Sequence, residues 1–163
     1  MNLERLFQMQ KGLDSHIEEK HNLQDEDLFD RKVLALLVEI GELANETRSF
    51  KFWSVKPSSA KEVILEEFVD GVHFILSLGI ECGYDTVQMN LNDGKSSLTV
   101  TEQFLYVYDR IIIFQKSRSS DDYIKLFASY LGLASLLGFT NEDIEMAYFH
   151  KNEVNYQRQQ NNY

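Results

Sequence analysis

Two pairs of acidic residues lie within apolar segments of this sequence. Glu39 and Glu42 form the first pair, and Glu67 and Asp70 form the second. A spacing of three places both members of a pair on the same face of a helix. Carboxylates among apolar residues are costly to bury unless their charge is compensated, so these pairs need a structural or chemical explanation.

The positions of the two pairs match across a helical hairpin. If the two helices pack antiparallel about a loop near Val55, Glu39 faces Asp70 and Glu42 faces Glu67. Four converging carboxylates repel one another, so either some are protonated or divalent cations bind between them. Oxygen ligands favour Mg²⁺ or Mn²⁺ over Zn²⁺. The pattern predicts a metal site that can bind a triphosphate. The alternative is that the two acidic pairs lie on solvated helix faces and form salt bridges with lysine or arginine.

Acidic pairs with this spacing are common in a chain with 26 acidic residues, so other pairs serve as controls. Asp27 with Asp30, and Glu142 with Glu145, both fall near expected helix N-termini. The helix dipole explains negative charge at such positions without any chemistry. We therefore interpret these two pairs as structural.

A second group of polar residues lies near the C-terminus. Lys151, Asn155 and Arg158 are spaced four and then three apart, so they share one helix face and could contact phosphate oxygens. A solvated basic face is the alternative. Earlier in the chain, Lys51 could add a positive charge and Trp53 could stack on a base, although such aromatic residues often belong to a core.

Apolar periodicity predicts an all-α fold for a single domain, 1–163. It is a helical bundle with a four-helix core, in which the second and third helices form the antiparallel hairpin that carries the metal site. The expected helices span approximately 2–19, 25–49, 59–82, 99–116, 121–137 and 140–158. A polar connection with a turn at 92–94 is expected between the third and fourth helices.

Several residues are expected to begin or end these helices. Asp25 would cap the second helix, and Ser59 with Glu62 would form a capping box for the third. Gly83 and Gly138 are expected just beyond the ends of the third and fifth helices. The remaining expectation is a sixth helix that opens at Thr140 with Asp143.

Composition limits the classes of partner. The formal net charge of -10 disfavours nucleic acid, which needs a basic face, but permits a nucleotide at a local site. Cys82 is the single cysteine, so no intramolecular disulfide can form, which fits a reducing compartment. The sequence shows neither a secretory signal nor an apolar run of the roughly 20 residues that a membrane span needs. We expect a cytoplasmic protein without a membrane partner.

Taken together, the motifs resemble those of the dimeric all-α dUTPases, members of the all-α NTP pyrophosphatase superfamily that includes MazG-like enzymes. The motifs that carry the resemblance are Gln10-x-x-Leu13-Asp14, Glu39-Ile-Gly-Glu42-Leu43, Phe50-Lys51-Phe52-Trp53, Glu67-Phe68-Val69-Asp70-Gly71-Val72-His73-Phe74-Ile75-Leu76-Ser77-Leu78 and Lys151-x-x-x-Asn155-x-x-Arg158-Gln159. They extend over almost the whole chain. Asp14 departs from the family pattern, which has asparagine there.

The resemblance implies a homodimer that hydrolyses dUTP to dUMP and pyrophosphate with Mg²⁺, or Mn²⁺, as cofactor. The metal ligands it implies are Glu39, Glu42, Glu67 and Asp70, and one of the first two would orient the attacking water. The substrate-binding residues it implies are Gln10, Asp14, Lys51, Trp53, Lys151, Asn155 and Arg158.

Three alternatives remain open from the sequence. A related pyrophosphatase for dCTP or for modified nucleotides would use the same acidic residues and differ only in its base pocket. A di-iron carboxylate bundle would need Glu-x-x-His twice, and here Asp70 precedes His73 in one of the two candidates. A non-catalytic interaction module would be expected to have lost part of the acidic set, which is complete here.

Overall fold

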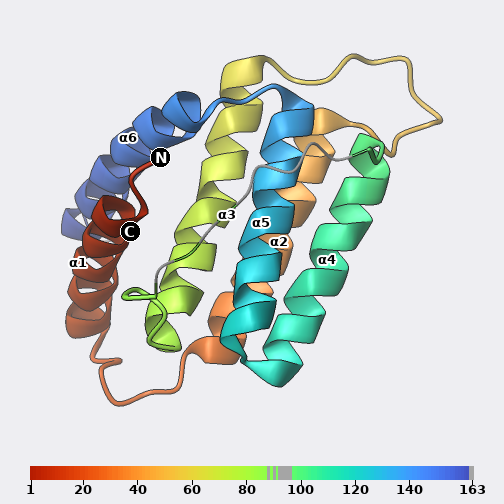
Figure 1. The fold of residues 1–163 in the computed structure, drawn as a ribbon. Helices are drawn as coiled ribbons and strands as arrows, with labels where there is room; N and C mark the ends of the chain where they lie inside the picture. The colour runs from red at the N-terminus through yellow and green to blue at the C-terminus, as the bar shows by residue number, and fades with distance from the viewer. Residues whose placement is uncertain (88, 90, 92–96, 162–163) are drawn as a thin grey trace.

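The structure, a computed structural model, describes residues 1–87, 89, 91 and 97–161, and these form six α-helices (Figure 1). The helices are α1 (Leu3–His21), α2 (Phe29–Thr47), α3 (Lys61–Glu81), α4 (Val100–Ser117), α5 (Ser120–Leu137) and α6 (Asn141–Gln160). The all-α prediction is confirmed, since no strand occurs in the described ranges. The expected turn at 92–94 lies outside the described residues.

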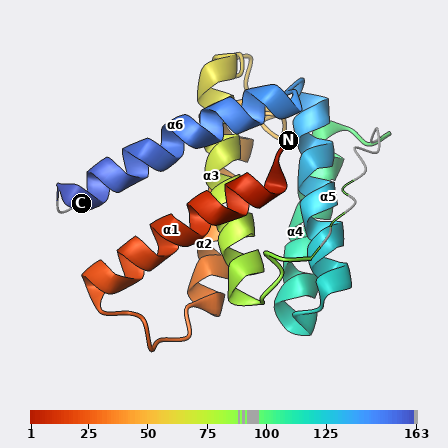
Figure 2. The same cartoon turned by 60° about the vertical axis from the view of Figure 1, so that its left-hand side comes forward.

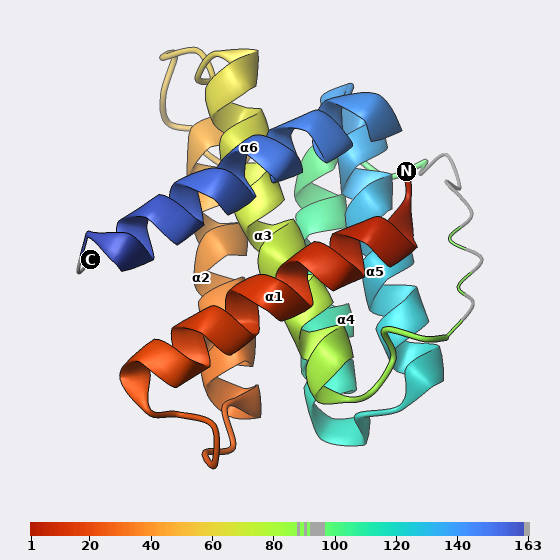
Figure 3. The same cartoon turned by 90° about the vertical axis from the view of Figure 1, so that its left-hand side faces the viewer.

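Four helices form a bundle and two cross it. Helices α2, α3, α4 and α5 run alongside one another, and α2 and α3 form an antiparallel pair (Figure 1). Helices α1 and α6 lie side by side across one face of α3 (Figures 2 and 3). The chain therefore places its first and last helices together over the pair that carries the acidic motifs.

Helix α3 is the centre of the packing. It contacts α1, α2, α5 and α6, and a helix with neighbours on most sides must be apolar around most of its circumference. Its sequence meets this requirement, with buried residues on nearly every turn: Ile64, Phe68, Val69, Gly71, Val72, His73, Ile75, Leu76, Ser77, Leu78 and Gly79. This burial fixes the direction in which its few polar side chains point.

Two glycines of α3 allow tyrosines of α5 to approach its backbone. The Tyr130 hydroxyl donates a hydrogen bond to the Phe68 carbonyl at 2.8 Å, and the two rings stack with centroids 4.3 Å apart. A Cβ atom at Gly71 would lie 2.2 Å from the Tyr130 hydroxyl oxygen. Gly79 faces Tyr123 with the same separation. The glycine after Asp70 thus serves helix packing directly behind the acidic motif.

The expected start of α2 is wrong. Asp25 does not cap the helix, which begins at Phe29 after Leu28 in the capping position. The Asp27 carboxylate instead accepts a hydrogen bond from the Phe29 backbone N–H at 3.0 Å. An acidic residue two positions before the helix thus takes the role expected of Asp25. Asp30 lies in the first turn, as the dipole interpretation of this pair requires.

The expected capping box of α3 is also wrong, because α3 begins at Lys61 after Ala60. The Ser59 backbone N–H donates to the Glu46 carbonyl at 3.0 Å, and its hydroxyl donates to the Glu46 carboxylate. Ser59 therefore ties the connection to the end of α2 and is not available as a cap, and Glu62 occupies the first helical turn without a capping partner of this kind.

Three other expected boundaries are confirmed. Gly83 follows α3 with a φ of 74°, and Gly138 ends α5 with a φ of 77°, both in the left-handed region that glycine adopts without strain. Thr140 caps α6 in a full capping box with Asp143. Local sequence signals therefore predict a helix boundary correctly where the capping residue has no competing partner elsewhere in the fold.

Among the described residues, no single helix has both the length and the apolar character to cross a membrane. Helices α5 and α6 meet that criterion only as a pair, bent by 106° at the break between them.

Replacement of Gly71 by alanine tests the close packing behind the acidic motif. The added methyl group would overlap Tyr130, so we expect Gly71→Ala to lower the free energy of unfolding by about 1–3 kcal/mol in urea denaturation. Gly41→Ala is the matched control, because its Cβ would meet Tyr108 at an ordinary 3.4 Å. That change should be neutral or stabilising by up to about 1 kcal/mol. Equal effects of the two substitutions would contradict the packing argument.

Candidate functional site

Three carboxylates of the two acidic motifs meet between α2 and α3. Glu39, Glu67 and Asp70 each offer an oxygen, and the three oxygens lie within 4.8 Å of one another. All three side chains are partly buried. The antiparallel register expected from the sequence accounts for this, since it places Glu39 opposite Asp70. We call these three residues the acidic cluster.

Glu42 lies beside the acidic cluster and outside the group of three oxygens. Its side chain is exposed, one helical turn from Glu39. Its charge still contributes to raising the pKa of both Glu39 and Glu67. The structure thus brings three of the four expected carboxylates into ligand distance and leaves the fourth at the solvent edge.

The acidic cluster resists full ionisation. Burial, followed by the charges of Asp70, Glu42 and Glu67, raises the pKa of Glu39 to about 7. Burial and the neighbouring carboxylates also raise the pKa of Glu67. Burial raises the pKa of Asp70, although the hydrogen bond and charge of Lys151 act against it. Repulsion of this kind is what a bound cation would relieve.

Lys151 of α6 is a buried partner of the acidic cluster. Its ammonium nitrogen lies 2.7 Å from an oxygen of Asp70 and 2.9 Å from an oxygen of Glu66. The residue is only 7% exposed. Burial opposes its charge, but the hydrogen bonds to Asp70 and Glu66 outweigh that effect and raise the pKa of Lys151. The sequence reasoning named Lys151 but missed Glu66, which is one position before Glu67.

A cleft of about 370 Å³ opens beside the acidic cluster. Helices α1 and α6, which cross over α3 in Figures 2 and 3, form its outer walls. The lining comprises Gln10, Leu13, Asp14, Ile17, Glu18, Leu28, Lys32, Glu39, Asp70, His73, Phe74, Ser77, Asn155, Arg158 and Gln159. Because Glu39 and Asp70 belong to both, a ligand in the cleft can reach the acidic cluster.

A chain of buried hydrogen bonds forms the inner wall of the cleft. Gln10 donates from Nε2 to Asp14 at 2.7 Å, and the Ser77 hydroxyl donates to the other Asp14 oxygen at 2.6 Å. The Gln10 carbonyl oxygen lies 2.7 Å from His73 Nδ1 and accepts from the Tyr148 hydroxyl at 2.8 Å. The His73 ring also stacks on Tyr148 with centroids 4.2 Å apart. Residues from α1, α3 and α6 are therefore held in one network.

This network fixes the orientation of each polar group. An ionised Asp14 only accepts hydrogen bonds, so the Gln10 amide must turn its NH₂ group toward Asp14 and its oxygen toward His73. His73 must then carry its proton on Nδ1, which leaves Nε2 as an acceptor without a hydrogen-bond partner among the described residues. Burial and the charge of Lys151 lower the pKa of His73 to about 3, so the ring is neutral.

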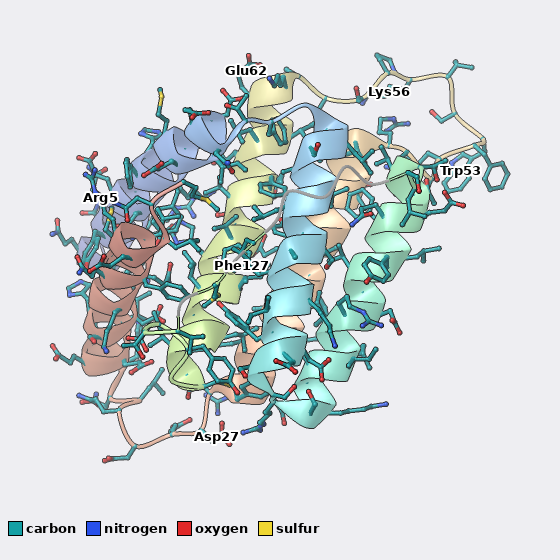
Figure 4. All side chains as sticks on the ribbon, in the orientation of Figure 1. Arg5, Asp27, Trp53, Lys56, Glu62 and Phe127 are labelled. Atoms are coloured by element: carbon teal, nitrogen blue, oxygen red, sulfur yellow. The ribbon has the colours of Figure 1, made fainter. Side chains whose placement is uncertain are left out.

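The other expected binding residues divide into two groups. Asn155 and Arg158 line the cleft from α6, together with Gln10 and Asp14 from α1. Trp53 lies instead on the connection between α2 and α3, which extends away from the bundle, and its side chain is 65% exposed (Figure 4). Lys51 lies on the same connection and donates a hydrogen bond to Asn45, near the end of α2. Neither of these last two lines the cleft as described, so their binding role stays a prediction.

Several residues of the cleft were missed by the sequence reasoning. His73 and Ser77 follow Asp70 by three and seven residues, and Lys32 precedes Glu39 by seven. These spacings place them on the same helix faces as the acidic residues, so the helical period could have indicated them. Their roles depend on α1 and α6, whose position over α3 no local pattern predicts.

Comparison with known proteins agrees with this geometry. A sequence model of the dUTPase family matches residues 2–163. The chain belongs to the dUTPase family. Comparison with curated proteins gives no match. Membership of the dUTPase family makes the protein a nucleoside triphosphate pyrophosphohydrolase with a nucleotide as its substrate. The resemblance inferred from the acidic, aromatic and C-terminal motifs is therefore confirmed at the level of the family.

The donor set of the acidic cluster fits a hard divalent cation. Glu39, Glu67 and Asp70 supply oxygen atoms alone, and Mg²⁺ and Mn²⁺ prefer such ligands. Mg²⁺ also retains several waters, so three protein oxygens leave room for water and phosphate. A divalent cation at the acidic cluster would therefore lie at the end of the cleft, where it could also contact a nucleotide bound there.

The raised pKa of Glu39 predicts an effect on stability in the absence of metal. The folded protein binds the Glu39 proton more tightly than the unfolded chain does. Protonation of Glu39 therefore stabilises the folded state fully below about pH 4.5, and this stabilisation is lost as pH rises through about 7. Glu39→Gln removes the ionisation. In chemical denaturation with a chelator, the stability of the variant relative to the parent should rise with pH over this window. Glu142→Gln, at an exposed first-turn position, is the control and should show no such trend.

Proposed function

We propose that this member of the dUTPase family hydrolyses dUTP to dUMP and pyrophosphate, with Mg²⁺, or Mn²⁺, at the acidic cluster. The observation that supports this most strongly is the shared wall, because Glu39 and Asp70 belong to both the cluster and the cleft. A nucleotide can place its base and sugar in the cleft and its phosphates at the carboxylates. The single Cys82 accords with action in the reducing cytoplasm.

The residues around the acidic cluster have distinct proposed roles. Glu39, Glu67 and Asp70 would hold the cation, with Glu42 as a fourth ligand at the solvent edge. When bound, the cation would neutralise phosphate charge and lower the pKa of a coordinated water. Either Glu39 or Glu42 would orient the water that attacks the α-phosphorus, after which pyrophosphate leaves. Both carboxylates lie on the α2 face that borders the cluster, so geometry permits either.

The C-terminal helix would contact the phosphates and the sugar. Asn155 and Arg158 line the cleft close to Asp70, and Lys151 lies directly against that carboxylate. Cationic groups in this position compensate the charge that develops on phosphate oxygens. The exposed Trp53 and the half-buried Lys51 would act from the connection between α2 and α3, as a cover for the bound nucleotide.

A nucleotide panel with pyrophosphate detection tests the proposed function. We expect dUTP to be the preferred substrate by a wide margin, with no turnover when a chelator removes divalent cations. Preference for dCTP or for modified nucleotides would instead support the related pyrophosphatase considered from the sequence. Glu67→Gln should lower kcat/KM by about 100-fold or more, since it removes a charged oxygen ligand. Glu142→Gln should retain full activity, and a fully active Glu67→Gln would contradict the proposed metal site.

We also propose that the protein is a homodimer. The neighbouring helices α2 and α4 each present large apolar side chains to solvent. Leu34 and Val38 are 63% and 50% exposed, and Leu105 is 66% exposed. Exposed aliphatic residues on two adjacent helices are typical of an interface between subunits.

Introduction of negative charge on this apolar face tests the proposed dimer. Leu34→Glu combined with Leu105→Glu should convert a dimer of about twice the 19.0 kDa chain mass into a monomer in light scattering. Met146→Glu changes an equally exposed apolar residue on α6 and should leave the mass unchanged. A monomeric parent protein would disprove the proposal, and a dimeric double variant would place the interface elsewhere.

A further inference from the structure

An aromatic side chain on the connection between α2 and α3 is almost fully exposed to solvent. Phe52 is 93% exposed, and its ring meets that of Trp53 edge-on with centroids 5.0 Å apart. The connection extends past the α4 side of the bundle, away from α1 and α6 (Figure 1). Phe52 has no role in the proposed reaction, so its exposure on this side needs another explanation.

Hydrogen bonds within the connection hold Phe52 in this exposed position. The Phe52 backbone N–H donates to the Phe50 carbonyl at 2.9 Å, which closes a tight turn. The Arg48 guanidinium donates to the Lys56 carbonyl at 3.1 Å and to the Ser54 hydroxyl at 2.7 Å. A segment ordered in this way loses little further freedom when it docks, so it is preorganised for binding.

A small pocket lies between α2 and α4, next to the same connection. Its walls include Ala44 and Phe50 on one side and Phe104, Leu105 and Tyr108 of α4 on the other. Its volume is about 150 Å³, and an apolar cavity of about this volume can bind benzene. Phe52 of the same subunit is not among the described residues that line it. The pocket therefore has room for one aromatic ring from outside the subunit.

The hydroxyl groups around this pocket are engaged within the subunit. Thr101 Oγ1 donates to the Ser49 carbonyl at 3.2 Å, and the Tyr108 hydroxyl donates to the Leu37 carbonyl at 3.2 Å. None of the described residues that line the pocket is charged. The pocket therefore suits an apolar side chain better than a nucleotide or an ion.

The pocket belongs to the face proposed for the homodimer. Leu105 lines the pocket and is also, with Leu34 and Val38, one of the exposed apolar residues of that face. A second copy on this face would therefore cover the pocket. In a two-fold dimer both subunits use the same surface patch, so a chain that carries an exposed aromatic residue and a matching pocket can form two equal contacts.

We propose that Phe52 of each subunit inserts into the pocket between α2 and α4 of a second copy of this chain. The inference rests on the proposed homodimer, goes beyond it by assigning a side chain and its pocket, and does not depend on the proposed reaction. Buried aromatic residues in pockets contribute much of the binding energy of interfaces. Docking would also fix Lys51 and Trp53, which flank Phe52 in the chain.

Crosslinking between two distinguishable copies tests this contact. One copy carries Phe52→Cys and a tag that increases its mass, the other carries Leu105→Cys, and Cys82→Ala removes the native thiol from both. After co-expression, a short thiol-specific crosslinker should join tagged to untagged chains in denaturing electrophoresis, because Leu105 borders the pocket. Met146→Cys in place of Leu105→Cys is the control at a similarly exposed position on α6, and it should give no mixed product.

The dissociation constant of the dimer, from analytical ultracentrifugation, is the second measurement. Phe52→Ala should raise it by about 30-fold or more, since an aromatic anchor is lost. Ala44→Phe fills the pocket from within its own subunit and should also raise it, and the two changes together should have no additive effect. Met146→Ala should leave it unchanged. Phe52→Ala alters a solvent-exposed residue and keeps the fold, so its result is decisive even if Ala44→Phe does not fold.

The possible failures are distinguishable. A dissociation constant of Phe52→Ala equal to that of the parent, or the lack of a mixed crosslinked product, would overturn the inference and leave the proposed homodimer in place. A monomeric parent protein would overturn both. Lack of dUTP hydrolysis would instead overturn the proposed reaction alone.

Discussion

Burial of α3 among four other helices is the constraint on which the rest of the structure depends. A helix in this position can present polar side chains only where a neighbouring helix leaves an opening or supplies a partner. Glu67 and Asp70 lie close to Glu39 of α2, and farther along the face that carries Asp70, His73 and Ser77 bond to residues of α1. One helix therefore carries residues of the acidic cluster and of the cleft wall on successive turns. The distance between the two is set by helical geometry and does not depend on a flexible loop.

Charge compensation follows from the same burial. The acidic cluster combines partly buried carboxylates with one buried lysine, so it retains uncompensated negative charge. The inner end of the cleft has a similar composition, because Lys32 is a single cation among three carboxylates. Each region has its counter-ions within hydrogen-bonding distance or close to it. Charges in surroundings of low polarity are stable only when partners lie this close.

Much of the fold could be predicted because it depends on local periodicity. The helical pattern, the glycine ends of α3 and α5 and the capping box of α6 are all encoded within a few residues. The facing of Glu39 and Asp70 was predictable because antiparallel packing relates their positions by simple symmetry. The caps of α2 and α3 were not, since Ser59 bonds to Glu46, thirteen residues earlier. That partner is visible only when the hairpin has formed.

The site was predictable where its residues share a helix and not where they meet between helices. Lys151 was recognised by its spacing, but its partner Glu66 lies 85 positions away in the chain. The Gln10, His73 and Tyr148 network likewise joins α1, α3 and α6. Such contacts depend on the crossing of α1 and α6 over α3, which is a tertiary property. A single sequence contains no periodic signal for it.

The pairing of Lys151 with Asp70 and Glu66 also links the C-terminal helix to the acidic cluster. One ammonium group holds α6 against α3, and the same group supplies the positive charge nearest to Asp70. The docking of α6 and the affinity of Asp70 for any other cation are therefore thermodynamically coupled. A cation that replaced Lys151 at Asp70 would weaken the attachment of α6, and loosening of α6 would leave Asp70 without its internal counter-ion. Asn155 and Arg158 lie on this helix, so a shift of α6 would carry part of the outer wall of the cleft with it.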